Sequence, residues 1–202
     1  MVSAALHGLL LAFGLILPLG AQNTFLLTQG ALHRRWVGAL PALITAGLSD
    51  TLLILMAVSG LSLVVLTVPW FKTALSWVGV IFLAYIGWVT WRARPEEAVG
   101  AGERWTARKQ VLFAASVSLL NPHAILDTIA VVGTSSLEYV GAPRLAFTIS
   151  TVSVSWLYFI ALVTAGHLLG SASSGVGFRL WLNRISAIII WAVGVRFLLS
   201  LL

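Results

Sequence analysis

Two aspartates stand inside long apolar stretches of the chain. Asp50 lies between Ser49 and Thr51, and Asp127 follows His123 by four residues. A carboxylate at membrane depth costs roughly 2.5–3.5 kcal/mol on insertion scales, so such a residue is expected to face the interior of a helix bundle. The alternative for Asp50 is a protonated or hydrogen-bonded packing residue. Together the two acids predict an acidic cavity that favours a cationic substrate, or protons, over an anion.

His123 and Asp127 are spaced to interact, since helical residues four apart lie one turn apart on the same face. A His–carboxylate pair inside a membrane can hold a proton or bind a cation, and the alternative is a neutral histidine in a structural hydrogen bond. Pro122 has no N–H and would free the carbonyl of Ser118, next to the amide of Asn121. We therefore predict a functional helix break here.

A similar break is predicted near the start of the chain. Pro18 cannot bond the carbonyl of Gly14, and Gly20 adds local backbone freedom. The amides of Gln22 and Asn23 follow directly. Unsatisfied backbone at membrane depth is tolerated only beside protein or a wet cavity, so this segment is expected to line one. The alternative is a kink packed for shape. Hydroxyl residues are weaker candidates, because they commonly mediate close helix packing: Ser150, Thr151, Ser153 and Ser155.

The chain is so apolar that its composition indicates a membrane protein. Hydrophobic residues make up 59% of the 202 residues and charged residues 9%, and the mean hydropathy is +1.01. A soluble fold of this size cannot bury so large an apolar fraction. The chain has no Cys, which excludes disulfides and thiolate sites. The net charge of +6 does not indicate nucleic-acid binding, because the basic residues fall between apolar segments.

The apolar segments predict an all-α integral membrane protein of six transmembrane helices, because each is near the roughly 20 residues that cross a bilayer. The predicted spans are 4–30, 37–66, 70–91, 110–134, 144–169 and 181–201. The first lacks a basic leader and a cleavage site, so we interpret it as a span. The second is long and is expected to tilt strongly or to break near Gly60.

The basic residues predict the orientation. Most of them fall in the first, third and fifth connections, namely Arg34, Arg35, Arg92, Arg94, Arg104, Arg108, Lys109, Arg179 and Arg184. The opposite side holds Lys72 and Arg144. Positively charged loops stay in the cytoplasm, so both termini are expected outside it.

The two predicted breaks also suggest internal symmetry. Three spans per half is an odd number, so two equivalent halves must be inverted relative to each other. We divide the single transporter domain, 1–202, into a first repeat at 1–91, a cytoplasmic loop at 92–109 and a second repeat at 110–202. Paired interruptions at corresponding positions of inverted halves are the best sequence indication of a transporter site at the membrane midplane.

These motifs resemble those of the lysine/arginine exporter family. The segment Gly-Leu-Ile-Leu-Pro-Leu-Gly-Ala-Gln-Asn at 14–23, with Phe25 and Gln29-Gly30 behind it, is similar to the opening motif of that family. Ser49-Asp50 and the segment 120–128 are similar to its second and fourth helices in order and spacing. The resemblance covers essentially the whole chain. The homoserine/threonine branch typically has a Pro-Gly-Pro type break instead, so the chain resembles the basic-amino-acid branch.

The resemblance implies export of lysine or arginine across the bacterial cytoplasmic membrane, driven by the membrane potential or a proton gradient. It implies that Asp50 and Asp127 contact the substrate's charge or exchange protons, and that the amides hold its α-amino and carboxylate groups: Gln22, Asn23 and Asn121. No cofactor, metal or nucleic acid is expected. Small residues such as Gly79 and Gly87 permit a homodimer.

Other functions were weighed against this one. An enzyme is not expected, because His-Glu-x-x-His and Gly-x-Ser-x-Gly are both absent. An exporter of metal cations or other cationic solutes is an alternative, since two Asp and one His can ligate a divalent ion, although no Cys or Met cluster accompanies them. A neutral amino acid is a further alternative substrate. A passive channel is disfavoured because paired breaks are typical of alternating access.

Overall fold

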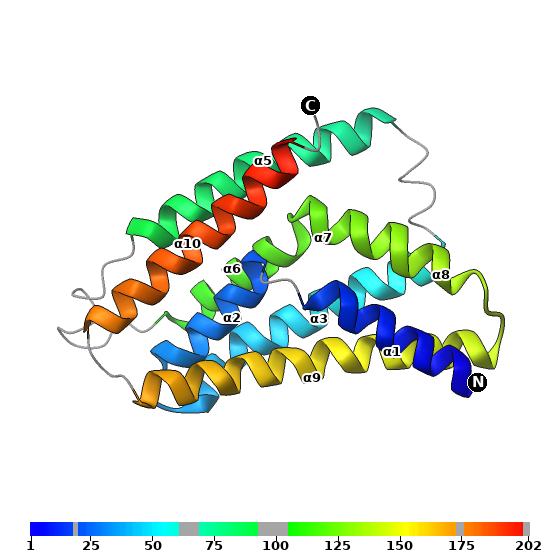
Figure 1. Ribbon diagram of the computed structural model, residues 1–202, viewed down its shortest axis with the longest axis horizontal. Coiled ribbons are helices and arrows are strands. Elements are labelled where there is room, and N and C mark those ends of the chain that lie inside the picture. The colour runs from blue at the N-terminus through cyan, green and yellow to red at the C-terminus, as the bar shows by residue number, and fades with distance from the viewer. Residues whose placement is uncertain (18–19, 61–68, 93–104, 173–175, 200–202) are drawn as a thin grey trace.

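The computed structural model describes residues 1–17, 20–60, 69–92, 105–172 and 176–199, and regular structure in these ranges is entirely helical (Figure 1). The helices are α1 (Val2–Ile16), α2 (Ala21–Leu32), η1 (Trp36–Ala39), α3 (Leu40–Val58), α5 (Pro69–Arg92), α6 (Ala107–Leu119), α7 (Pro122–Asp127), the π-helix η3 (Thr128–Gly133), α8 (Thr134–Ser136), α9 (Ala142–Ala172) and α10 (Val176–Leu199). The all-α prediction is confirmed for these residues.

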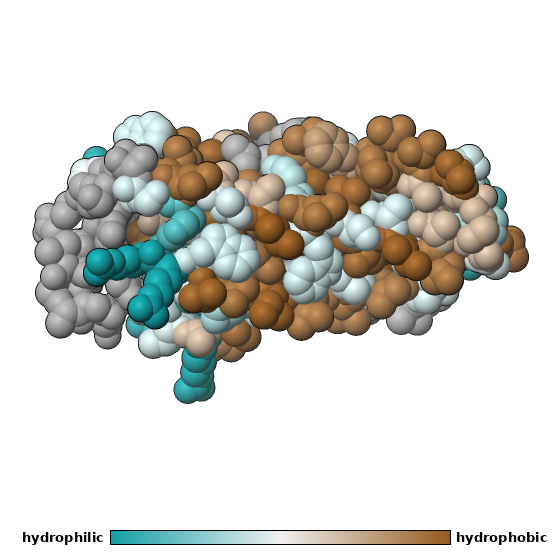
Figure 2. Space-filling model, turned by 90° about the horizontal axis from the view of Figure 1, so that it is seen from below, coloured by the Kyte–Doolittle hydropathy of each residue, from teal (hydrophilic) through white to brown (hydrophobic). Residues whose placement is uncertain are grey.

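Two of the described helical segments, Trp36–Val58 and Ala142–Ser171, are long and apolar enough to cross a membrane. The bent pair α1–α2 makes a third if it counts as one span. Large apolar side chains such as Leu10, Ile81 and Leu157 face outward, as lipid contact requires. Figure 2 shows apolar side chains over much of one face, with hydrophilic side chains gathered toward one end of the long axis.

Helix α9 is the longest helix, and α1 and α2 pack along it in succession. Helix α3 packs against α6, α9 and the π-helix η3, while α5 and α10 run side by side along the opposite edge of the molecule (Figure 1). Helix α10 also contacts α2. The starts of α2 and α7 are therefore held between α9 and the α5–α10 pair.

Glycines bring α2 and α9 into backbone contact. A side chain on Gly30 would collide with the Val163 carbonyl, and a side chain on Gly166 would collide with the Leu27 carbonyl. Gly170, one turn further along α9, also meets the backbone of α2. Small residues four apart permit such close crossings in membrane helices. This crossing fixes the position of α2 along α9, and thereby the position of the residues at the N-terminal end of α2.

The span boundaries agree with the sequence in most places. Helix α3 ends at Val58, and Gly60 follows with a φ of +80°, whereas the remainder of the predicted second span lies outside the described residues, so the choice between a tilt and a break stays a prediction. Helix α5 and helix α9 match the third and fifth predicted spans within three residues. Helix α10 begins at Val176, five residues before the predicted start of the sixth span at 181.

Candidate functional site

The first predicted break lies between α1 and α2, whose axes differ by 79°. Helix α1 ends at Ile16, and α2 begins after Gly20, which has extended backbone angles. Pro18 lies outside the described residues. Asn23 Nδ2 donates a hydrogen bond to the Ile16 carbonyl at 2.8 Å, and the Thr24 hydroxyl donates to the Gly20 carbonyl at 2.8 Å. Side chains of α2 therefore satisfy carbonyls at this break.

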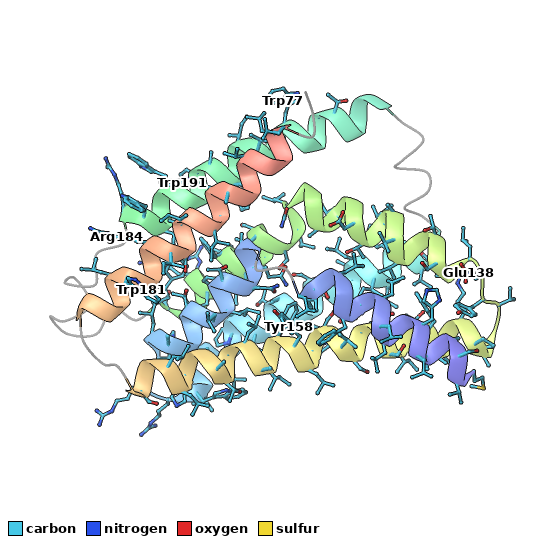
Figure 3. The ribbon with its side chains drawn as sticks, in the orientation of Figure 1. Trp77, Glu138, Tyr158, Trp181, Arg184 and Trp191 are labelled. Carbon is cyan, nitrogen blue, oxygen red and sulfur yellow. The ribbon has the colours of Figure 1, made fainter. Side chains whose placement is uncertain are left out.

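A residue from α9 also holds the break. The Tyr158 hydroxyl donates to the Leu17 carbonyl at 3.3 Å, and Figure 3 shows Tyr158 midway along the molecule. We had expected free carbonyls here, with Asn23 available for the substrate. One amide hydrogen of Asn23 is instead engaged by the backbone, which gives this residue a structural role besides its place at the site.

The second predicted break separates α6 from α7. Helix α6 ends at Leu119, and α7 starts at Pro122 with Asn121 as its N-terminal cap residue. Asn121 is 7% exposed, and its Oδ1 has no hydrogen-bond partner. After Asp127 the chain continues as a π-helix, which the sequence did not predict. Short π-helical segments occur frequently at functional sites.

A cavity of about 330 Å³ lies between the two breaks. Helices α1, α2, α3, α7 and α9 all contribute to its wall. Its polar side chains are Gln22, Asn23, Asp50, Asn121, Asp127, Thr128, Thr151 and Ser155. The structure thus brings together the amide-bearing residues of both breaks and both membrane-depth acids. Gly20 lines the same cavity, and an added Cβ there would meet open space.

His123 belongs to α7, one turn before Asp127, but its side chain lies outside the described part of the structure. The predicted His–Asp pair is therefore not tested, and Asp127 has other interactions of its own. Pro122 is the first residue of α7, a position at which proline is common because its missing N–H has no partner there in any case.

Two hydroxyl residues of α9 complete the site. Ser155 is 3% exposed and is a hydrogen-bond partner of the Asp50 side chain. Thr151 lines the cavity and donates to the Phe147 carbonyl at 2.8 Å. The sequence ranked both as weak candidates, together with Ser153, which is exposed and does not line the cavity. Only the packing of α9 against α3 distinguishes Ser155 and Thr151 from Ser153.

A second polar cluster, which the sequence analysis missed, lies beyond the C-terminal end of α2. Gln110 of α6 is 2% exposed. Its Oε1 accepts a hydrogen bond from the Ala42 backbone N–H at 3.2 Å. Its Nε2 donates to the carbonyls of Gly38 at 2.9 Å and Trp105 at 3.0 Å, and lies 3.2 Å from His33 Nε2. One side chain therefore connects α6 to η1, α3 and the end of α2.

The tautomer of His33 follows from its neighbours. Its Nδ1 lies 2.9 Å from the Gln29 carbonyl, which can only accept, so Nδ1 carries the hydrogen. In a neutral ring Nε2 then carries no hydrogen and can only accept; it lies 3.2 Å from Gln110 Nε2, whose two hydrogens also face the Gly38 and Trp105 carbonyls. The His33 carbonyl in turn lies 3.2 Å from His167 Nδ1 on α9. The Gln110 cluster, which comprises these residues and the partners of Gln110, connects five elements at this end: α2, η1, α3, α6 and α9.

The opposite end of the molecule has its own polar contacts. His7 Nδ1 lies 2.9 Å from the Tyr139 hydroxyl and 4.0 Å from a Glu138 carboxylate oxygen, and Arg144 donates to the Val58 carbonyl at the end of α3. Figure 3 shows Glu138 at this end and Arg184 toward the other. The cavity thus lies between two polar ends of a largely apolar helix bundle.

Apolar helices that enclose a polar cavity between two broken segments define a membrane transporter. Residues 13–201 match the family model described as LysE type translocator, and the chain belongs to this family. The predicted family resemblance is therefore confirmed. Membership in this family indicates a transporter.

Individual relatives agree with this assignment. The chain is 48% identical over 200 residues to the Bacillus subtilis (strain 168) protein named "Putative amino-acid transporter YisU", covering 99% of this chain and 91% of that one. It is 31% identical over 201 residues to "Arginine exporter protein ArgO" of Enterobacter sp. (strain 638), covering 96% and 92%. The corresponding protein of Escherichia coli O157:H7 is 29% identical, covering 97% and 93%. No solved structure matches the chain.

Proposed function

We propose that the protein exports basic L-amino acids, arginine or lysine, from the cytoplasm across the bacterial inner membrane. The observation that carries the proposal is the cavity that joins Asp50 of α3 and Asp127 of α7 to the amides of both helix breaks. Two carboxyl groups inside a membrane protein favour a cation, because an unpaired charge there is costly. The names of the arginine-exporting relatives support the same substrate class.

We assign the acidic and the amide side chains of the cavity to different parts of the substrate. Asp50, oriented by Ser155, and Asp127 bind the guanidinium or ammonium group of the substrate side chain or exchange a proton with it. His123, one helical turn before Asp127 on α7, shares a proton with that acid in this proposal. Gln22, Asn23 and Asn121 hold the amino-acid head group. Transport is coupled to the membrane potential or a proton gradient, and alternating access occurs around the two breaks.

We further propose six spans in two inverted repeats, with both termini outside the cytoplasm. Helices α5 and α10, at 24 residues each, have sufficient length to cross beside the apolar segments described above. The breaks after Ile16 and Leu119 occupy corresponding positions in the two halves. Arg34 and Arg35 directly follow His33 of the Gln110 cluster, and the excess of Lys and Arg in the connections of that side supports a cytoplasmic Gln110 cluster.

The absence of Cys makes the orientation simple to test. In intact cells a membrane-impermeant maleimide is expected to label Glu138→Cys, whose parent residue is 66% exposed, and to leave Arg35→Cys unlabelled until the cells are opened. Labelling of Arg35→Cys alone in intact cells would refute the orientation, and labelling of both would refute the assignment of these residues to opposite sides.

The function is tested by efflux of radiolabelled arginine and lysine from preloaded proteoliposomes. Wild type is expected to release at least one of them, and Asp50→Asn and Asp127→Asn are expected to slow release at least tenfold. Glu138→Gln, which removes a carboxylate remote from the cavity, is the matched control and should retain wild-type rates. Equal rates in all variants would contradict the assignment of the two acids.

Other cationic solutes, including metal ions, are the alternative cargo. Within the described ranges no group of three or more His, Asp or Glu side chains is close enough to hold a metal ion. The same proteoliposomes loaded with divalent cations, or with a neutral amino acid such as threonine, decide the point. Release of these and of neither arginine nor lysine would replace the proposed substrate.

A further inference from the structure

Two buried polar atoms of the cavity residues have no hydrogen-bond partner in the described structure, and their chemistry is opposite. Gln22 Nε2, at the start of α2, is a donor without an acceptor. Asn121 Oδ1, just before α7, is an acceptor without a donor. A buried donor or acceptor left unpaired costs about 1–3 kcal/mol, so such atoms are retained where a ligand or water satisfies them.

The surroundings of Gln22 strengthen its donor character. The first intrahelical bond of α2 runs from the Thr24 N–H to the Gly20 carbonyl, so the N–H groups of Ala21 and Gln22 precede the hydrogen-bonded ladder. Gly20 is the cap residue, and its missing side chain leaves open space on the cavity side. A small anionic group can therefore approach this backbone, where the helix dipole also favours it.

Asn121 presents an unpaired acceptor, in contrast to the unpaired donor of Gln22. It is 7% exposed, so water reaches its unpaired Oδ1 poorly. Its neighbours along the cavity wall include Asp127 and Thr128, which are acceptors or can act as acceptors. This wall is suited to an ammonium group, which offers three donors and no acceptor.

We propose that Gln22 and the first turn of α2 bind the α-carboxylate of the substrate, that Asn121 binds its α-ammonium group, and that transport therefore requires an intact amino-acid head group. This proposal rests on the proposed function and specifies its site. Asp50, on the α3 wall beside Ser155, is then left for the cationic side chain. The cavity, at about 330 Å³, is at the small end of the roughly 300–1,000 Å³ of small-molecule sites and suits one amino acid better than a peptide.

The discriminating substrate is agmatine, which is arginine without its carboxylate. Both compounds carry the guanidinium and the amine, so Asp50 and Asp127 alone would not distinguish them. Wild type in proteoliposomes is expected to release arginine about ten- to hundredfold faster than agmatine at equal subsaturating loading, the range that one charge-assisted hydrogen bond provides. Release of both at the same rate would overturn the carboxylate site while leaving cation export intact.

Gln22→Glu replaces the donor with a carboxylate, which repels the α-carboxylate of the substrate. We expect arginine release to fall at least tenfold while agmatine release is unchanged or faster. Ser171→Glu, at an exposed position near the end of α9, adds the same charge away from the cavity and should leave the ratio unchanged. Gln22→Met removes the donor without adding charge and is expected to lower the arginine-to-agmatine ratio at least tenfold.

The outcomes distinguish a failure of the proposed carboxylate site from a failure of the proposed export function. If both Gln22 variants are monodisperse and thermally stable yet keep the wild-type ratio, the proposed carboxylate site is wrong. If Gln22→Glu does not fold, Gln22→Met decides the question by its ratio. If wild type releases neither arginine, lysine nor agmatine, the export function itself fails, and the head-group proposal fails with it.

Discussion

Replacing Gln110 by Leu tests whether the Gln110 cluster holds one end of the helix bundle together. The substitution introduces an apolar side chain of comparable bulk that is one bond shorter, and it removes every polar contact of the amide. Three partners lose a hydrogen bond, namely the Ala42 N–H and the carbonyls of Gly38 and Trp105, and His33 Nε2 loses its 3.2 Å contact with the amide nitrogen. Because these partners belong to separate elements, the loss affects the relative position of α2, α3 and α6.

The size of the effect follows from the burial of each partner. Ala42 is 0% exposed, so its N–H is left without water and costs about 1–3 kcal/mol. Gly38 and Trp105 are half-buried, so water replaces part of each bond, and each loss costs about 0.5–1.5 kcal/mol. The expected destabilisation is about 2–6 kcal/mol, a large fraction of the roughly 5–15 kcal/mol that stabilises a typical domain.

Thermal unfolding in detergent measures this directly, with Thr45→Val as the matched control. Thr45 lies on α3 near the cluster, but its hydroxyl bonds only the Pro41 carbonyl one turn away, so the control is expected to lose less than about 1 kcal/mol. A melting temperature of Gln110→Leu equal to that of the control would refute the reasoning.

Three further predictions concern helix contacts. Gly166→Val forces α2 and α9 apart and should lower stability by about 1–3 kcal/mol or more in detergent unfolding, whereas Gly177→Ala, where an added Cβ meets nothing within 4 Å, should not; equal losses would contradict the close crossing. Trp156→Phe removes the 3.1 Å bond to the Thr51 hydroxyl and should cost about 0.5–1.5 kcal/mol by the same measurement; no loss would show that this bond is solvated. Arg144→Met removes the donor to the Val58 carbonyl at the end of α3 and should cost about 1–2 kcal/mol, with amide exchange faster at the C-terminal end of α3 than at its start; uniform exchange would argue against capping.

The helix breaks were predictable because their causes are local. Proline lacks the N–H that continues a helix, and polar residues beside it have no reason to lie in lipid. The sequence therefore located the end of α1 and the start of α7 within a few residues. It could not locate the π-helix after Asp127, because nothing in Thr128–Gly133 differs from an ordinary apolar helix and its register is set by packing against α3.

The Gln110 cluster was missed for the opposite reason. Gln110 and His33 each stand at the edge of an apolar segment, next to charged residues, where a polar side chain is ordinarily solvated. Their burial depends on α2, α3 and α6 meeting at one end, which is a tertiary contact between residues 77 positions apart. The same limit applies to Ser155, whose type indicates packing and whose contact with Asp50 appears only when α9 lies against α3.

The Gln110 cluster and the cavity are coupled through one helix. Helix α2 carries Gln22 at its first turn and ends at Leu32, directly before His33, and Gly30 lies between them at the contact with α9. A rigid helix that changes its tilt must move both ends together, so a change at the Gln110 cluster would reach the cavity without any further relay. Helix α2 is therefore the element most directly placed to link access at one end with head-group binding at the other. Loss of the bonds of Gln110 should consequently alter substrate affinity as well as stability, although Gln110 does not line the cavity.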